Sequence, residues 1–175
     1  MKRSLLLLPL LALTGAALAQ SAAKPSTAPY PSRPIRLLMP FPAGGTPDAL
    51  GRTVATQVES QLGQSIVVDN RTGANGLIAY ELGAKGAPDG YTLVHATPSF
   101  ALNTIVYKKP AYDLHRDFTP VTNIAQGYGY LMLVHPSVQA TNVKELIAYA
   151  KTQTKPLTYG TPGVGNTLHL ATELF

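Results

Sequence analysis

The chain contains no cysteine and no tryptophan, and only 13% of its residues are charged. The absence of cysteine excludes disulfide bonds and thiol chemistry, so the fold must rely on an ordinary hydrophobic core. The formal net charge is +5, but the basic residues are scattered, and Lys108-Lys109 is the only adjacent pair after residue 19. A basic stripe with interleaved aromatic side chains, typical of nucleic-acid-binding proteins, is missing. We therefore predict no nucleic-acid partner.

The sequence also lacks an apolar run long enough to span a membrane, which takes roughly 20 residues. A shorter run, Leu5 to Leu13, follows the basic residues Lys2 and Arg3 and leads to Ala17-Leu18-Ala19. This order is typical of a cleaved secretory signal peptide. We predict a signal peptide at residues 1–19, a flexible leader at residues 20–34 rich in Ala, Ser and Pro, and export to the periplasm.

The stretch Phe41-Pro42-Ala43-Gly44-Gly45-Thr46-Pro47-Asp48 stands between an apolar run and an amphipathic segment. This order predicts a strand, a glycine turn and the start of a helix. Thr46 is suited to the N-cap, Pro47 to the first helical position and Asp48 to the positive helix end. N–H groups at such an end can bind phosphate or carboxylate, although an ordinary βα loop uses the same residues.

Strand and helix patterns alternate through the first half of the chain. Strands are predicted at residues 35–39, 65–69 and 91–96. Leu50, Val54, Val58 and Leu62 predict one apolar helix face that ends at Gly63, and a short helix is expected at residues 77–85. This β-α-β-α-β order predicts an α/β fold with a parallel, doubly wound sheet. We assign residues 35–126 to a first domain.

In the second half, strand and helix patterns no longer alternate regularly. Strands are predicted at residues 119–125, 130–135 and 157–159. Asn142 and Glu145 form a capping-box pattern before a helix, and a glycine-rich turn at residues 160–167 precedes another helix from about Leu168. We predict that a second α/β domain starts at residue 127, that it is incomplete at Phe175, and that a hinge lies at residues 126–130. The two glycine turns would face each other across a cleft, as in periplasmic binding proteins.

Several short motifs occur in an order that resembles one known family. They are Tyr30-Pro31-Ser32-Arg33-Pro34-Ile35-Arg36, Pro40-Phe41-Pro42-Ala43-Gly44-Gly45, Val68-Asp69-Asn70-Arg71, Ala87-Pro88-Asp89-Gly90-Tyr91-Thr92-Leu93, Asp117-Phe118-Thr119-Pro120-Val121 and His135-Pro136-Ser137-Val138. The chain resembles the Bug family of extracytoplasmic solute receptors, also called tripartite tricarboxylate transporter substrate-binding proteins. The similarity runs from about Tyr30 to Phe175 and matches the N-terminal half of such a receptor.

The resemblance implies a monomeric periplasmic receptor that captures a small carboxylate-bearing solute between two domains and delivers it to the membrane subunits of a tripartite tricarboxylate transporter. It implies a carboxylate held by backbone amides and hydroxyl groups, without cofactor or metal. The ligand-binding residues carried over by position are Phe41, Gly44, Gly45, Thr46, Asp48, Thr97, Ser99, Thr161, Gly163, Gly165, Asn166, Thr167 and His169. Pro47 and Asn166 depart from the family pattern, which commonly has hydroxyl residues there.

Other interpretations remain open at the level of sequence. Asp48 can serve only to complement its helix, and His169 can be a core histidine. His169 and Glu173 share a helix face, but two ligands alone do not make a metal site. A Walker lysine, a nucleophile elbow and a His-Glu-x-x-His pair are all absent, so an enzyme is not predicted. The alternatives to a working receptor are a truncated, non-functional remnant and, less favoured, an exported α/β enzyme.

Overall fold

The computed structural model describes residues 29–127 and 129–175. The predicted signal peptide, residues 20–28 of the predicted leader, and Tyr128 of the predicted hinge lie outside the described residues. Within them, the elements run in the order β1, α1, β2, η1, α2, β3, α3, α4 and α5.

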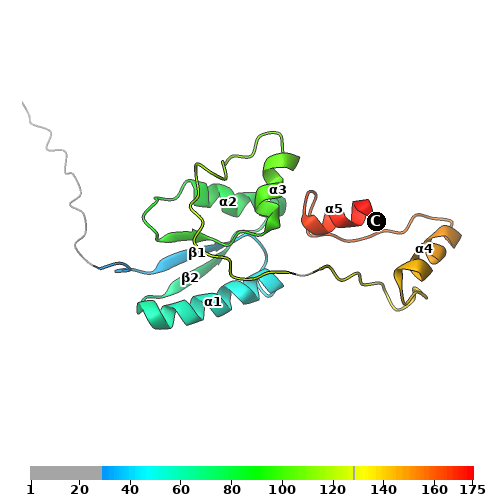
Figure 1. The fold of residues 1–175 in the computed structure, drawn as a ribbon, viewed down its shortest axis with the longest axis horizontal. Helices are drawn as coiled ribbons and strands as arrows, with labels where there is room; N and C mark the ends of the chain where they lie inside the picture. Colours follow the sequence, from blue (N-terminus) through cyan, green and yellow to red (C-terminus); the bar gives the residue numbers. More distant parts are fainter. Residues whose placement is uncertain (1–28, 128) are drawn as a thin grey trace, which may run out of the picture.

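A three-stranded parallel sheet forms the centre of the first half (Figure 1). Its strands are β1 (Ile35–Met39), β2 (Ile66–Asn70) and β3 (Thr92–Val94), in the spatial order β2-β1-β3. Helix α1 (Thr46–Leu62) covers one face and helix α2 (Leu77–Ala84) covers the other. In the register, Leu37 of the central strand lies opposite both Val68 and Leu93. The predicted parallel, doubly wound α/β fold is thereby confirmed.

The core between the sheet and α1 consists of Ile35, Ile66 and Ala55. The predicted apolar face of α1 is confirmed at Val58, which packs against this core, but is wrong at Leu50 and Leu62, which are 37% and 38% exposed. A four-residue spacing drifts around a helix with 3.6 residues per turn. The buried face instead includes Gly51 and Ala55, whose small size lets α1 approach the sheet closely. The predicted helix end at Gly63 is confirmed, with φ +65° and its N–H donating to the Glu59 carbonyl.

A helix that we did not predict, α3 (Pro98–Val106), follows β3 directly. Thr97 is its N-cap and Pro98 starts its first turn, a combination that favours helix initiation. The short 3₁₀ helix η1 (Ala74–Gly76) lies between β2 and α2 and contacts α3. Aromatic rings fix α3 to its surroundings: Phe100 stacks on Tyr112 at a centroid distance of 5.2 Å and meets Phe118 edge-on at 4.9 Å.

The second half contains helices α4 (Val143–Thr152) and α5 (Thr167–Leu174). The predicted cap before α4 is confirmed at Asn142, whose side chain accepts from the Glu145 N–H, but the Glu145 carboxylate accepts from the N–H of Thr141, one residue before the N-cap of a standard capping box. The predicted strands at residues 119–125, 130–135 and 157–159 are not formed in the described part of the chain. A strand needs a neighbouring backbone to pair with, and these segments have none among the described residues.

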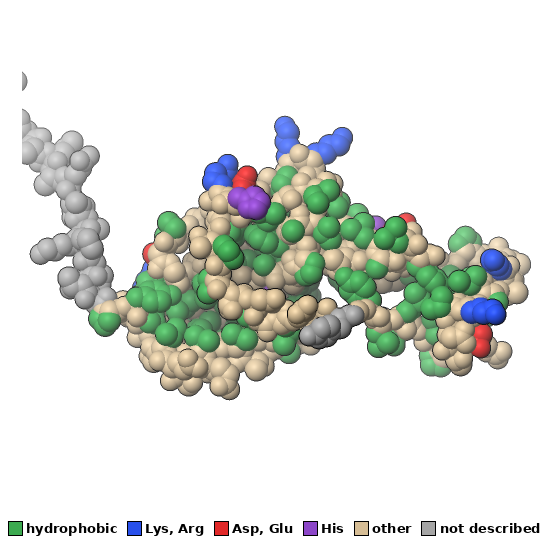
Figure 2. Space-filling model, in the orientation of Figure 1, with side chains coloured by type: hydrophobic (Ala, Val, Ile, Leu, Met, Phe, Trp, Pro, Cys, Tyr) green, Lys and Arg blue, Asp and Glu red, His purple; other side chains and the backbone are tan. Residues whose placement is uncertain are grey.

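Apolar side chains of the second half are widely exposed (Figure 2). Leu131 and Leu133 are 83% and 82% exposed, and no residue of α4 or α5 is fully buried. Helix α4 lies at the far end of the molecule from the sheet (Figure 1). Across residues 29–127 and 129–175, no helix has the length and apolarity needed to cross a membrane.

Candidate functional site

The first glycine turn is braced by the Asp48 carboxylate. One oxygen, Oδ2, accepts from the Gly44 N–H and from Arg52 Nε, each at 2.9 Å; the other, Oδ1, accepts from Asn70 Nδ2 at 2.9 Å. Asn70 Nδ2 also donates to the Phe41 carbonyl at 2.9 Å. The hydrogen bonds from Arg52, Asn70 and Gly44 hold the pKa of Asp48 well below its ordinary value. Both carboxylate oxygens are therefore occupied in shaping the loop.

The start of α1 differs from the sequence-based expectation. Gly45, not Thr46, is the N-cap, and no side chain caps this helix end. Thr46 becomes the first helical residue and is exposed, with Pro47 directly after it. The left-handed φ of +86° at Gly44 makes the sharp turn that precedes this helix end. The N-terminus of α1 is thus open at the carboxyl end of β1.

The loop after β3 starts a second helix whose N-terminus has no side-chain cap. Thr97 is the N-cap of α3, and its hydroxyl lies 3.3 Å from the Tyr80 hydroxyl. Ser99 is 1% exposed and its Oγ accepts from Asn166 Nδ2 at 3.0 Å. Of these two predicted site residues, Thr97 stands at the helix entrance and Ser99 lies inside the contact with the second half.

The second glycine turn leads into α5 and is held mostly by its own groups. Gly163 and Gly165 have φ angles of +145° and +79°. The Thr161 hydroxyl accepts from the Gly163 N–H at 3.4 Å, and His169 Nδ1 accepts from the Gly165 N–H at 3.4 Å. Asn166 is the N-cap of α5, with its Oδ1 accepting from the Leu168 N–H at 2.9 Å.

Near its end, α5 contacts the segment that precedes the second glycine turn. The Tyr159 hydroxyl bonds to the Glu173 carboxylate, which raises the pKa of Tyr159. His169 Nε2 lies 3.8 Å from the same carboxylate. In the described part of the chain, no group of three or more histidine or acidic side chains is arranged to hold a metal ion. His169 and Glu173 thus remain a local pair on one helix.

The loops from both halves meet at the carboxyl edge of the sheet. Asn166 reaches Asn75 of η1 and Ser99 of α3, and a Cβ placed on Gly163 would lie 3.8 Å from Asn75 Cβ. Gly76 of η1 in turn packs against Pro40, the residue after β1. The structure therefore connects the loops after β1, β2 and β3 with the second glycine turn. Ligands of open α/β sheets bind at this edge.

Two buried residues of this region, Asn75 and Asn103, were missed by the sequence analysis. Asn75 Nδ2 donates to Asn103 Oδ1 at 2.9 Å, and Asn103 Nδ2 donates to the Asn75 carbonyl at 3.1 Å. The glycines on either side of Ala74-Asn75 indicated an unusual backbone, and Asn75 has φ +54°. The signal for Asn103 was the Thr97-Pro98 helix start, which places Ser99 and Asn103 one turn apart.

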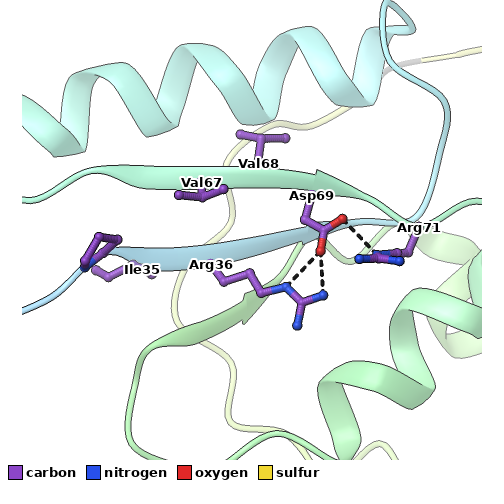
Figure 3. Close-up of a pocket in the computed structure, with 7 residues that line it drawn as sticks. Ile35, Arg36, Val67, Val68, Asp69 and Arg71 are labelled. Carbon is purple, nitrogen blue, oxygen red and sulfur yellow. Dashed lines mark hydrogen bonds and ion pairs between the residues drawn. The ribbon is translucent and has the colours of Figure 1, made fainter.

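A shallow hollow elsewhere on the sheet is lined by Arg36, Val67, Asp69 and Arg71 (Figure 3). Arg36 Nε and Arg71 Nε each donate to Asp69 at 2.8 Å. Burial raises the pKa of Asp69, but the two arginine partners outweigh it and the pKa lies below its ordinary value. Val68 points toward α1 whereas Asp69 points away from it, so the hollow lies on the other face of the sheet. It is separate from the glycine turns.

His95 directly follows β3 and is buried, with 8% of its surface exposed. Its Nδ1 has no hydrogen-bond partner among the described residues, and burial lowers the pKa of the imidazole. A Cβ on Gly51 would lie 3.3 Å from this atom, so the ring packs against α1. His95 therefore belongs to the packing beneath the first glycine turn.

A parallel α/β domain whose strand-end loops meet a glycine turn from a second unit defines the class of two-domain solute-binding proteins. Residues 50–175 match the family model described as the tripartite tricarboxylate transporter family receptor. The chain belongs to this family. The family is one of receptors rather than enzymes, which confirms the prediction from sequence.

Curated relatives support the same assignment. The chain is 35% identical to Protein BugT of Bordetella pertussis over 156 residues, which is 88% of this chain and 48% of that protein. It is 38% identical to a UPF0065 protein of Cupriavidus necator over 145 residues, which is 82% of this chain and 43% of that protein. The resemblance to the Bug family is thereby confirmed. The chain spans about half the length of the curated relatives it matches.

Solved structures share the fold. One described as a periplasmic transporter has a TM-score of 0.73 and 35% identity, covering 83% of this chain and 49% of the other. The R. palustris protein Rpa4515 with adipate has a TM-score of 0.72 and 39% identity, covering 83% and 48%. MatC from Rhodopseudomonas palustris with bound malate has a TM-score of 0.56 and 27% identity, covering 70% and 42%.

Proposed function

We propose that this protein is a periplasmic receptor that binds a small organic acid between its two glycine turns for a tripartite tricarboxylate transporter. The observation that carries the proposal is the contact of the second turn with the loops after β2 and β3, through Asn166, Asn75 and Ser99. The adipate and malate on two structural relatives support a carboxylate as the recognised group. Residues 1–19 direct export, and the first domain extends to residue 126.

The carboxylate is held by backbone N–H groups at the starts of α1 and α3. Both helix ends lack a side-chain cap, and both lie at the carboxyl edge of the sheet. N–H groups at a helix start attract an anion through hydrogen bonding and the helix dipole. The exposed Thr46 hydroxyl and the Thr97 hydroxyl add donors from the same two helix ends. This arrangement binds a charge without burying a bare cation, which would carry a large desolvation cost.

The remaining predicted residues divide into three groups. Gly44, Gly45, Gly163 and Gly165 give the two turns their shape, while Asp48 braces the first turn. Phe41, Thr161, Thr167 and His169 border the solute from the two turns. Asn166 and Ser99 join the second turn to α3. The chain acts as a monomer that passes its solute to membrane transporter subunits.

The test is a thermal melt of the purified protein against adipate, malate, citrate, an amino acid and nicotinate. A solute at a hundredfold excess over its Kd adds about 2.7 kcal/mol of stability, which raises the Tm by about 5–10 °C for a chain of this size. Recovery of the unchanged acid after the melt separates a receptor from an enzyme. A Tm that none of the acids raises contradicts the proposal.

A pair of variants at Gly45 tests whether the carboxylate of the solute binds at the start of α1. A Cβ at this position meets only Pro42 O and Pro47 Cδ, both at an ordinary 3.7 Å, and its φ of −79° suits any residue. Gly45→Ser and Gly45→Asp both supply an N-cap oxygen, but only Gly45→Asp adds a negative charge. Because either new oxygen competes with the solute for the Asp48 N–H, we expect Gly45→Ser to reduce the acid-induced rise in Tm and Gly45→Asp, which also repels the carboxylate, to abolish it. Equal responses of the two variants would place the solute elsewhere.

A further inference from the structure

Four buried polar side chains form one hydrogen-bonded cluster across the junction of the two halves, which we call the amide cluster. Its members come from three separate elements, and each is no more than 6% exposed. They are Asn75 of η1, Ser99 and Asn103 of α3, and Asn166 at the start of α5. Residues 91 positions apart in the chain, Asn75 and Asn166, are joined directly. Buried polar groups without partners are costly, so such a cluster holds together only when its bonds are satisfied.

The hydrogen bonds of the amide cluster have a fixed direction. Asn166 Oδ1 accepts from the Leu168 N–H, which can only donate, so Asn166 Nδ2 must face the first half. There it donates to Asn75 Oδ1 at 3.1 Å and to Ser99 Oγ at 3.0 Å. Asn75 Oδ1 is thus an acceptor, which leaves Asn75 Nδ2 to donate to Asn103 Oδ1. The cap of α5 orients the amide that joins the two halves.

The amide cluster has a permanent part and an exchangeable part. The two bonds between Asn75 and Asn103 lie wholly within the first half and do not depend on α5. The two bonds from Asn166 cross between the halves, together with a weaker one from the Tyr107 hydroxyl to the Val164 carbonyl at 3.3 Å. If α5 moves away, water can replace Asn166 at Asn75 Oδ1 and Ser99 Oγ. A contact of this kind is strong enough to select one arrangement and weak enough to be reversible.

We propose that Asn166 is a latch: its side-chain amide holds the second glycine turn closed on the first domain through Asn75 and Ser99, and it releases when the two halves separate. Asn166 is a positioning residue rather than a solute contact, because both side-chain ends are already bonded. The latch itself stands independently of any solute. Its effect on solute affinity rests on the proposed function.

The absence of cysteine from these 175 residues makes a direct test possible in this chain. Lys85→Cys after α2 and Leu174→Cys at the end of α5 replace exposed residues and accept one spin label each, on opposite sides of the junction. Pulsed electron paramagnetic resonance then gives the distance distribution between the halves. The measurement needs no solute, so it reads the latch even if no acid binds.

The decisive variant is Asn166→Ser, which keeps an oxygen to cap α5 but removes the amide donor. Loss of two net hydrogen bonds lowers the ratio of closed to open molecules on the order of tenfold. We expect the distances to shift toward longer values. The matched control is Asn142→Ser, the same substitution at the exposed N-cap of α4, which should leave the distances unchanged while circular dichroism reports equal helix content.

Ser99→Ala tests the same bond from the first domain and supports the latch if it shifts the distances in the same direction by a smaller amount. If Asn166→Ser fails to fold, the Ser99→Ala variant decides alone. Distances unchanged in the folded variants would overturn the latch, and an equal shift in Asn142→Ser would show a general loss of helix capping instead. With a solute that raises the Tm of the unaltered protein, Asn166→Ser should bind it more weakly, chiefly through faster dissociation.

Discussion

Gly76 joins η1 to α2 and is the position where an added methyl group should be most harmful. Its φ is +88°, and a Cβ would lie 2.8 Å from Tyr80 Cε2 and 2.9 Å from Pro40 Cβ. Both neighbours are stiff: Tyr80 is fully buried and Pro40 is held in its ring. Gly63 offers a matched control, with φ +65° and no heavy atom within 4 Å of its Cβ.

The two substitutions separate backbone strain from steric overlap. A left-handed backbone costs a residue with a Cβ about 1–2 kcal/mol, and overpacking in a tight site adds about 1–3 kcal/mol. Gly63→Ala meets only the first cost, whereas Gly76→Ala meets both. We therefore expect a loss of about 1–2 kcal/mol in unfolding free energy for Gly63→Ala and of about 2–5 kcal/mol for Gly76→Ala.

Urea unfolding followed by far-UV circular dichroism measures both losses, provided that the urea dependence of the unfolding free energy stays the same in each variant. Gly76 also brings the loop after β1 against η1, so Gly76→Ala should weaken any acid-induced rise in Tm. If Gly76→Ala destabilises the protein no more than Gly63→Ala, the close packing of Pro40, Gly76 and Tyr80 is refuted.

Two titrating groups give further predictions. The pKa of Asp48 is lowered by Arg52, Asn70 and Gly44, so below about pH 4 the unfolded chain takes up a proton that the folded chain does not. Stability is then lost on acidification, and Asp48→Asn should flatten that loss in urea unfolding measured from pH 7 down to acid. Burial raises the pKa of Tyr112 to about 12, so unfolding is favoured as the pH rises from about 10 to 12. Tyr112→Phe should remove this alkaline loss and, without the 2.6 Å bond to the Phe100 carbonyl, cost about 1 kcal/mol at neutral pH. An acid loss as steep in Asp48→Asn as in the unaltered chain, or an unchanged alkaline loss in Tyr112→Phe, would contradict these assignments.

The local patterns of the first half predicted its parallel sheet and the helices α1 and α2, but not α3. Runs such as Ile66-Val67-Val68 are short, apolar and bounded by turn residues, which predicts a strand. The left-handed glycine at position 63 ends its helix regardless of what the helix packs against. The cap that Asn142 provides for α4 was equally local, and the structure confirms it. Features that depend only on residues a few positions apart can therefore be predicted directly from the sequence.

Features that depend on distant partners could not be read in this way. The apolar runs containing Leu131 and Leu157 have strand composition, but a strand exists only beside another backbone. Likewise, the spacing of Leu50 and Leu62 predicted the wrong apolar face for α1 at these two positions. The buried face is instead determined by Gly51, which has no side chain and so allows α1 to approach Met39 closely. The bond between Asn166 and Asn75 has no signal in either segment alone. The predicted solute contacts stay predictions.

The capping of the helices connects stability with the proposed function. Helices α4 and α5 are capped by the side chains of Asn142 and Asn166, whereas α1, α2 and α3 begin at Gly45, Gly76 and Thr97 without a side-chain cap. A side-chain cap stabilises a helix by about 1 kcal/mol. The starts of α1 and α3 lack this contribution to the free energy of folding. The starts of α1 and α3 both lie at the carboxyl edge of the sheet. A bound carboxylate would complete these two helix ends, so the same N–H groups that weaken the empty receptor would give it affinity for an anion.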